Sequence, residues 1–230
     1  MKHRSYRGRI LYLTDGVGEM GRESFYVTIQ PDGTRTLRAA CEMDDDALMR
    51  DVVATLDGDW RPVDAFVRLT VHGNFLGSSW FKFTPTQAEC QGITARDGRF
   101  HQSFELAGPM ESLGTHPVHA DTWYLGRFSD RRPGAEDDGG GVRFTTSTQA
   151  NGGSGPLLRP SAGRKRRRYI GRETITVRAG RFTADHFQDI FPDRPPADLW
   201  ATPEDCAPIR ISWPHLKQTY ELVELSGDAR

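Results

Sequence analysis

Apolar and polar side chains alternate along most of this chain with a period of two residues. Stretches with this pattern include YRGRILYLT, ESFYVTIQ, TRTLRAACEM, VDAFVRLTV, FLGSSWFKF, RFHQSFEL, ETITVRAG, RFTADHFQ, APIRISW and QTYELVEL. Such a period places successive side chains on opposite faces of a β-strand. Turn signals such as Pro31-Asp32-Gly33 and Gly73-Asn74 separate the stretches. The pattern therefore predicts an antiparallel meander.

One stretch fits two kinds of element. DDDALMRDVVATL has acidic residues that can cap a helix, and its apolar positions Leu48, Val52 and Leu56 suit a helix as well as a strand. We predict a strand here because strand patterns lie on both sides of it.

The hairpin VDAFVRLTV-HGN-FLGSSWFKF predicts the shape of the sheet. A two-residue turn at Gly73-Asn74 would pair Val71 with Leu76, Leu69 with Ser78 and Val67 with Trp80. The other face would then carry Phe66, Arg68, Thr70, Phe75, Ser79 and Phe81. Neither face is purely polar, which predicts a sheet that is covered on both sides and curls around an interior pocket.

Length and composition favour one domain spanning residues 1–230, since all-β barrels and sandwiches of 230 residues commonly form a single unit. Residues 129–163 interrupt the alternation with SDRRPGAEDDGGG and QANGGSGPLLRPSAG. Their high content of Gly, Pro, Asp and Ser predicts a flexible insertion. It can be either an inert insertion, which is the commoner case, or a lid over a pocket.

Charge and cysteine content restrict the partners. The chain has 30 Lys+Arg against 31 Asp+Glu, so no net field favours nucleic acid or an anionic membrane. No apolar run is long enough to span a bilayer, and the first residues lack a signal-peptide cleavage pattern, so we expect a cytoplasmic protein. Cys41, Cys90 and Cys206 are widely spaced and predict reduced thiols.

The segment ETITVRAGRFTADHF, with DLWATPEDCAPIRISW, LDGDWRPVDAFV and the final YELVEL, resembles an uncharacterised bacterial β-sheet family. The hairpin of that family usually reads V-P-A-G-x-F, and Arg178 stands here in place of the proline. Its members look like half-barrels related to lipocalins and to periplasmic lipoprotein carriers. The resemblance implies a lipocalin-like open barrel and supports fold far more than function. Many such relatives are exported, whereas no signal peptide is evident in this chain.

Two motifs are better explained without a ligand. Gly16-Val-Gly18-Glu-Met-Gly21 matches the dinucleotide-binding G-x-G-x-x-G, but a strand pattern rather than a helix follows it. The basic run at 164–168 lacks interleaved aromatic residues and lies near Glu136, Asp137 and Asp138, which is typical of a solvated strand end. We therefore predict neither a nucleotide nor a nucleic-acid site.

The stretch LGTHPVHADTWYL holds the strongest candidate for chemistry. On an extended chain, His119 and Asp121 point the same way, so the carboxylate could orient the imidazole as a general base. His116 could join them if the chain turns at Pro117. A structural loop with hydrogen-bonded histidines is the commoner outcome for such a stretch. The H-x-x-H-x-D spacing also differs from the H-x-D of mononuclear iron enzymes, so we predict no metal.

These observations predict an all-β protein with a single antiparallel, lipocalin-like open barrel or strongly curled sheet. The leading functional hypothesis is a cofactor-independent acid/base enzyme of the isomerase, hydratase or lyase type, acting on an apolar or aromatic small molecule in the barrel. His119 would be the base, Asp121 its orienting group and His116 the proton donor. The alternative is a cytoplasmic carrier or sensor of a hydrophobic small molecule without chemistry. The oligomeric state is not predicted.

The substrate contacts follow from the hairpin and the loop. Arg68 would fix an anionic group if its face is internal, although an outward-facing arginine is the commoner case. Trp80, Phe81 and Trp123 would supply apolar wall.

Overall fold

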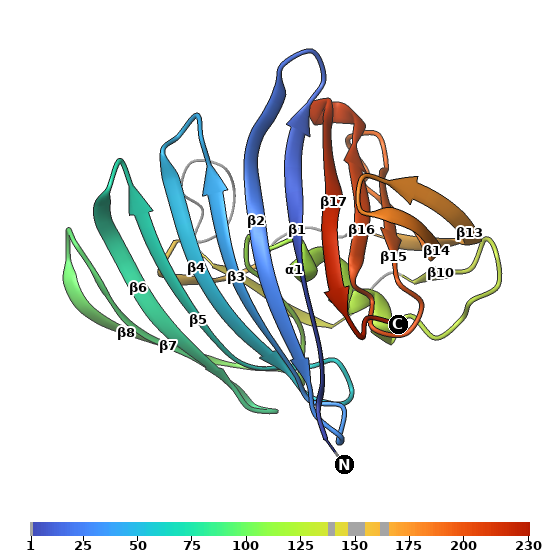
Figure 1. Cartoon of the computed structure of the whole chain (residues 1–230). Coiled ribbons are helices and arrows are strands. Elements are labelled where there is room, and N and C mark those ends of the chain that lie inside the picture. Colours follow the sequence, from blue (N-terminus) through green and yellow to red (C-terminus); the bar gives the residue numbers. More distant parts are fainter. Residues whose placement is uncertain (1, 138–140, 147–154, 162–165) are drawn as a thin grey trace.

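The computed structural model describes residues 2–137, 141–146, 155–161 and 166–230. Fourteen strands form one antiparallel sheet in the order β10-β13-β14-β15-β16-β17-β1-β2-β3-β4-β5-β6-β7-β8, which is strongly curled (Figure 1). The strands of the N-terminal half are β1 (Arg4–Thr14), β2 (Gly18–Ile29), β3 (Arg35–Met43), β4 (Leu48–Leu56), β5 (Pro62–Val71), β6 (Asn74–Phe83), β7 (Gln87–Thr94) and β8 (Gly98–Glu105). The others are β10 (Glu136–Asp137), β13 (Arg166–Val177), β14 (Gly180–Ile190), β15 (Ala197–Ala201), β16 (Pro208–Trp213) and β17 (Gln218–Gly227). The predicted all-β curled sheet is confirmed, and its edge strands β8 and β10 do not pair to close a barrel.

The alternating patterns explain these strands. In β2 the inward positions Glu23, Phe25, Val27 and Ile29 are buried, while the outward neighbours Ser24 and Tyr26 are exposed. The stretch DDDALMRDVVATL contributes β4, as predicted, and alternation of buried and exposed residues persists through its first half. The segment after the G-x-G-x-x-G motif continues as β2, with Gly16 and Gly18 at positive φ in the hairpin turn.

The hairpin of β5 and β6 corrects one prediction. Its turn is at His72 and Gly73, which both have positive φ, of 49° and 74°. This turn pairs Val71 with Asn74, and a β-bulge between Leu69 and Thr70 then shifts the pairing by one residue. Beyond the bulge, Val67 pairs with Ser79, one residue away from the predicted register. A slip of one residue exchanges the two faces of a strand. The bulge therefore places Val67, Ser79 and Phe81 on the buried inner face. The outer face remains mixed, since Phe66 and Trp80 are exposed on it, so it is not covered as the sequence predicted.

A short helical segment lies on the inner face of the sheet. It consists of α1 (His119–Thr122) followed by the 3-10 helix η1 (Trp123–Arg127), and it packs behind the central strands in Figure 1. Its buried residues Trp123 and Leu125 join one hydrophobic cluster with Tyr6, Phe25 and Phe187 from the sheet. A second 3-10 helix, η2 (Pro214–Leu216), connects β16 to β17. No helix within the described residues combines the length and the apolar composition needed to cross a bilayer.

A three-stranded inner sheet fills the rest of the concavity. It is formed by β9 (Met110–Gly114), β11 (Val142–Thr146) and β12 (Leu158–Pro160), in the order β12-β11-β9. Phe144 and Leu158 are buried against Val67, Phe81 and other inward residues of the large sheet. These parts of the expected insertion at 129–163 are thus packed strands. Residues 138–140, 147–154 and 162–163 of that insertion lie outside the described residues.

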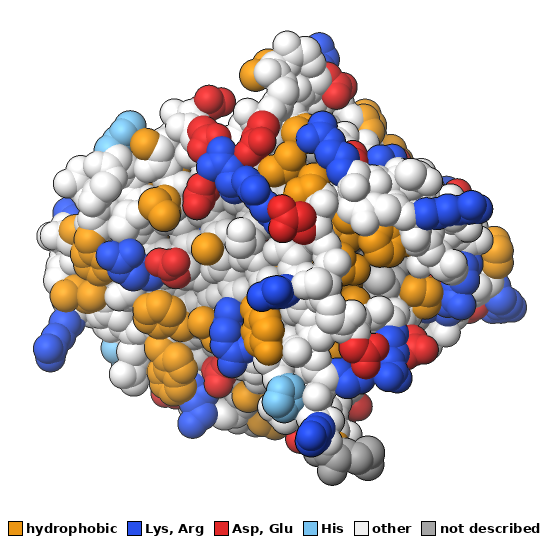
Figure 2. All heavy atoms as spheres, viewed as in Figure 1, with side chains coloured by type: hydrophobic (Ala, Val, Ile, Leu, Met, Phe, Trp, Pro, Cys, Tyr) orange, Lys and Arg blue, Asp and Glu red, His pale blue; other side chains and the backbone are white. Residues whose placement is uncertain are grey.

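The outer face of the sheet has charged side chains interspersed with apolar ones (Figure 2). The basic run contributes to this pattern, since Arg166 and Arg168 both form ion pairs with Glu136. The three cysteines are free and buried, as the reduced thiols predicted from the sequence would be.

Candidate ligand-binding site

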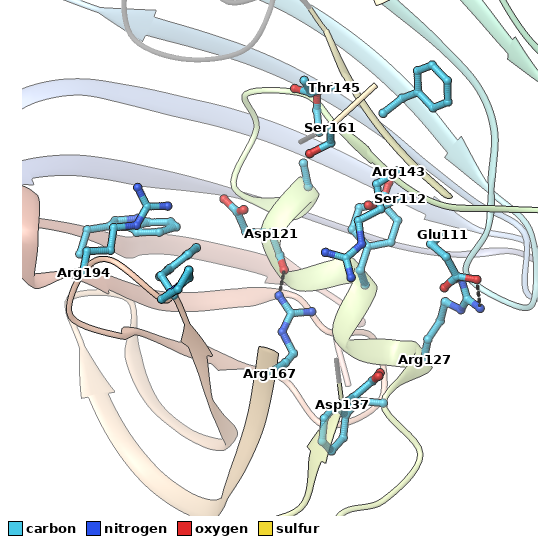
Figure 3. A pocket seen from close by; sticks show the side chains of 18 of the residues that line it. Glu111, Ser112, Asp121, Arg127, Asp137, Arg143, Thr145, Ser161, Arg167 and Arg194 are labelled. Carbon is cyan, nitrogen blue, oxygen red and sulfur yellow. Dashed lines mark hydrogen bonds and ion pairs between the residues drawn. The ribbon is translucent and has the colours of Figure 1, made fainter. Parts of the chain in front are cut away.

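A cavity of about 540 Å³ lies between the inner sheet, the helical segment and the loop after β14 (Figure 3). Ser112 from β9, Asp121 from α1 and Arg143 from β11 line it on one side, and the loop 191–194 lines it on another. The helical segment and the inner sheet cover the concave face of the large sheet, and the cavity forms where they meet the loop. This volume is typical of sites for small molecules.

The walls of the cavity are rich in aromatic rings. The aromatic residues are Tyr124, Phe128, Phe144, Phe191 and Trp213. The ring centroids of Phe191 and Trp213 are 6.4 Å apart, and the guanidinium of Arg194 lies 3.9 Å from the Phe191 centroid. Such walls can bury an apolar or aromatic body, with cation–π contacts along one side.

Charged groups lie between the aromatic ones, and two of the arginines are held by carboxylates. Arg127 forms an ion pair with Glu111. Arg167 donates two hydrogen bonds to the buried Asp189 carboxylate, at 2.6 and 3.0 Å, and one at 3.4 Å to the backbone carbonyl of Asp121. Burial opposes the charge of Arg167, but the Asp189 carboxylate raises its pKa above the ordinary value. Both arginines are therefore fixed parts of the wall.

His119, the predicted general base, lies away from this cavity in the core. Its side chain is fully buried, with Phe25 at 4.6 Å and Trp123 at 5.3 Å between ring centroids. Nε2 lies 3.5 Å from the Tyr6 hydroxyl, and Nδ1 lies 3.6 Å from a Glu23 oxygen. Burial lowers the pKa of the imidazole, and the Glu23 carboxylate opposes that shift.

The carboxylate partner of His119 is thus Glu23 and not Asp121. Glu23 also accepts hydrogen bonds from the Tyr12 hydroxyl at 2.9 Å and from the Val118 backbone N–H at 2.8 Å. A signal for Glu23 exists in the sequence, because it is a charged residue on the otherwise apolar face of ESFYVTI. Sequence reasoning missed it by searching for the partner of His119 only nearby in the chain.

The three residues of the predicted reaction centre do not converge. Asp121 lines the cavity, whereas the His116 ring packs edge-on against Tyr12, with centroids 5.5 Å apart. The prediction assumed an extended chain, but residues 119–122 are helical. Helical residues two apart point about 200° away from each other, so His119 and Asp121 face opposite ways. Within the described residues, no three His, Cys, Asp or Glu side chains gather as a metal site.

The predicted substrate contacts are also dispersed. Arg68 and Trp80 lie on the outer face, where Arg68 is 3.6 Å from Asp51 and Trp80 is 42% exposed. Phe81 and Trp123 are inward but buried in the core, and neither lines the cavity. The one-residue register slip explains why Arg68 was expected on an internal face together with Phe81.

No family model matches this chain, and no curated protein matches its sequence. Among solved structures it is similar to a beta-barrel-like protein of a domain of unknown function, DUF1849, from Brucella abortus. The two share 9% sequence identity with a TM-score of 0.55, over 99% of this chain and 98% of the other. At that identity the similarity shows the fold alone, which is a β-sheet fold resembling a barrel.

Proposed function

We propose that this protein is a non-catalytic carrier or sensor that binds a small molecule with an apolar or aromatic body. The observation that carries the proposal is the cavity of about 540 Å³ with five aromatic residues in its walls. Ligand sites combine such a predominantly apolar lining with a few polar groups that fix orientation. The cavity supplies both, since Ser112, Thr145 and the arginines lie among the rings.

The fold supports a binding role. Curled sheets with a ligand on the inner face are a common solution for carrying small apolar molecules. The expected relation to lipocalins and the cytoplasmic location remain predictions. An acid/base enzyme is the competing proposal, but its predicted base is enclosed in the core and its predicted orienting carboxylate lies in the cavity.

The proposal is tested with N-phenyl-1-naphthylamine, an uncharged aromatic probe whose fluorescence rises in an apolar site. We expect saturable binding by the native chain. Ser112→Trp places a large ring into the cavity, and we expect it to weaken binding by roughly tenfold or more, because the probe and the indole cannot share the space.

Ser103→Trp is the matched control, because Ser103 is exposed on β8, outside the cavity lining. It should bind the probe like the native chain. Thermal melts establish that each variant is folded. The absence of saturable binding, or equal binding by folded Ser112→Trp and native protein, would show that the cavity is not a ligand site.

A further inference from the structure

One wall of the cavity has hydrogen-bond donors that no group of the described chain accepts. It is formed by Phe191, Asp193, Arg194 and Trp213. Arg194 stacks on Phe191, and Phe191 contacts the Trp213 ring. Figure 3 shows Arg194 across the cavity from Ser112 and Arg143, with Asp121 between them.

Two donors in this wall have no acceptor among the described residues. Arg194 forms no hydrogen bond or ion pair in that part of the chain, so its guanidinium N–H groups remain available while the group lies over the Phe191 ring. The Trp213 indole nitrogen is buried and likewise has no hydrogen-bond partner. A buried N–H without a partner is costly, and a ligand acceptor would remove that cost.

Two arginines elsewhere in the cavity walls differ from Arg194, because each is held by a carboxylate of the protein. Arg127 is paired with Glu111, and Arg167 is paired with Asp189. Asp193 is the carboxylate next to Arg194 along the chain, and it also lines the cavity. Its carboxylate would repel an anion, and it accepts hydrogen bonds but donates none, so Arg194 and Trp213 are the hydrogen-bond donors of this wall.

From this arrangement we infer that the ligand carries an anionic group beside its aromatic or apolar body. The group is a carboxylate, sulfonate or phosphate that accepts hydrogen bonds from Arg194 and Trp213, while the body lies against the aromatic residues of the cavity. This inference rests on the proposed function, and it adds the charge of the ligand and the residues that recognise it.

The test compares two probes that share one ring system. 1-Anilinonaphthalene-8-sulfonate carries a sulfonate, and N-phenyl-1-naphthylamine lacks it. We expect Arg194→Gln to weaken binding of the sulfonate probe by about threefold or more, the effect of losing a partly solvated charged hydrogen bond, and to leave the uncharged probe unchanged. Trp213→Phe keeps a ring and removes the N–H, and it should show the same selectivity.

Two further measurements sharpen the test. Asp193→Asn removes the repelling carboxylate, so it should tighten binding of the sulfonate probe by about twofold, and added salt should weaken that probe alone. Arg96→Gln is the matched control, because Arg96 is exposed in the turn after β7 and does not line the cavity. It should change neither probe.

The outcomes separate the two proposals. If Ser112→Trp abolishes binding of both probes but Arg194→Gln affects them equally or not at all, the cavity binds ligands and the inference about an anionic group is wrong. If Ser112→Trp affects neither probe, the proposed function itself is wrong.

Discussion

His119 shows how burial decides the role of a single side chain. The residue looks catalytic in the sequence because an imidazole and a carboxylate stand close together. In the structure its ring is enclosed by Phe25, Trp123 and Tyr6 and contacts the buried Glu23. The pair of Glu23 and His119 ties the helical segment to β2, together with the hydrogen bond from Val118 to Glu23. We interpret His119 as a residue that positions α1 on the sheet.

This role predicts how stability depends on pH. The pKa of His119 is lowered in the folded protein, so the folded state stays neutral where the unfolded chain, with a pKa of about 6.5, already takes up a proton. The stability contribution is therefore complete above about pH 6.5 and is lost as the pH falls toward the folded pKa. We expect His119→Gln to show a shallower loss of unfolding free energy between about pH 7 and 5.5 than the native chain.

Urea unfolding at a series of pH values measures this slope. His101→Gln is the control, because the His101 side chain is 54% exposed on edge strand β8 and lies outside the core. Its curve should run parallel to that of the native chain. A His119→Gln curve that is also parallel would show that the buried imidazole does not contribute to the pH dependence.

At the scale of elements, the turn between β5 and β6 sets the pairing at the end of the hairpin, and the bulge between Leu69 and Thr70 sets it further along. His72 has a φ of 49°, a region that costs most side chains free energy and that Asn tolerates better. An Asn-Gly pair is the preferred sequence for a two-residue turn of this kind. We expect His72→Asn to stabilise the protein by roughly 0.5 kcal/mol and His72→Val to destabilise it by roughly 1 kcal/mol. Urea unfolding measures both, and shifts of the same sign would contradict this account of the turn.

The same hairpin shows which parts of this fold the sequence pattern predicts, namely the strands, and which it does not, namely their exact register. Alternation located most strands of the large sheet, because each strand has one buried face. It did not locate the turn, since both His72-Gly73 and Gly73-Asn74 can occupy a tight turn. It also gave no sign of the bulge after Leu69, which exchanges the faces of the paired strands. It also missed β9, β11 and β12. Phe144 of β11 and Leu158 of β12 are buried by long-range packing, although the surrounding residues are rich in Gly and Pro.

The candidate site was less predictable than the strands for a related reason. Its residues come from the helical segment α1–η1, the inner sheet, the loop after β14 and strands of the large sheet including β13 and β16, which only the fold brings together. Asp121 was identified from local sequence, but its neighbour Arg167 is 46 residues away along the chain. Arg194 belongs to no recognisable sequence motif. Its proposed role in ligand binding follows only from its position over the Phe191 ring in the cavity wall.

At the scale of the whole molecule, the sheet extends in two directions from one central seam. β1 pairs with β17, the strands of the N-terminal half follow outward to β8, and those of the C-terminal half follow outward to β10. The segment between the two halves supplies the helix, the inner sheet and much of the cavity wall. The seam therefore holds together two halves that are otherwise built from contacts between neighbouring hairpins.

An ion pair next to this seam is expected to contribute strongly to stability. Asp205, which is buried, accepts hydrogen bonds from both terminal nitrogens of Arg4 at 2.9 and 2.8 Å and from the Arg230 backbone N–H at 2.8 Å. Asp205→Ala would remove these acceptors and leave Arg4 only the Asp228 backbone carbonyl, at 3.0 Å, so we expect it to lower the free energy of unfolding by roughly 2 to 3 kcal/mol. Arg4→Ala should also lower it, because it leaves the buried Asp205 carboxylate without a cation, and the double variant should lose less than the sum of the two. Asp228→Ala is the control, since Asp228 is 49% exposed and 4.0 Å from Arg4, and it should cost below about 0.5 kcal/mol. Equal losses for Asp205→Ala and Asp228→Ala in urea unfolding would show that the seam does not depend on this pair.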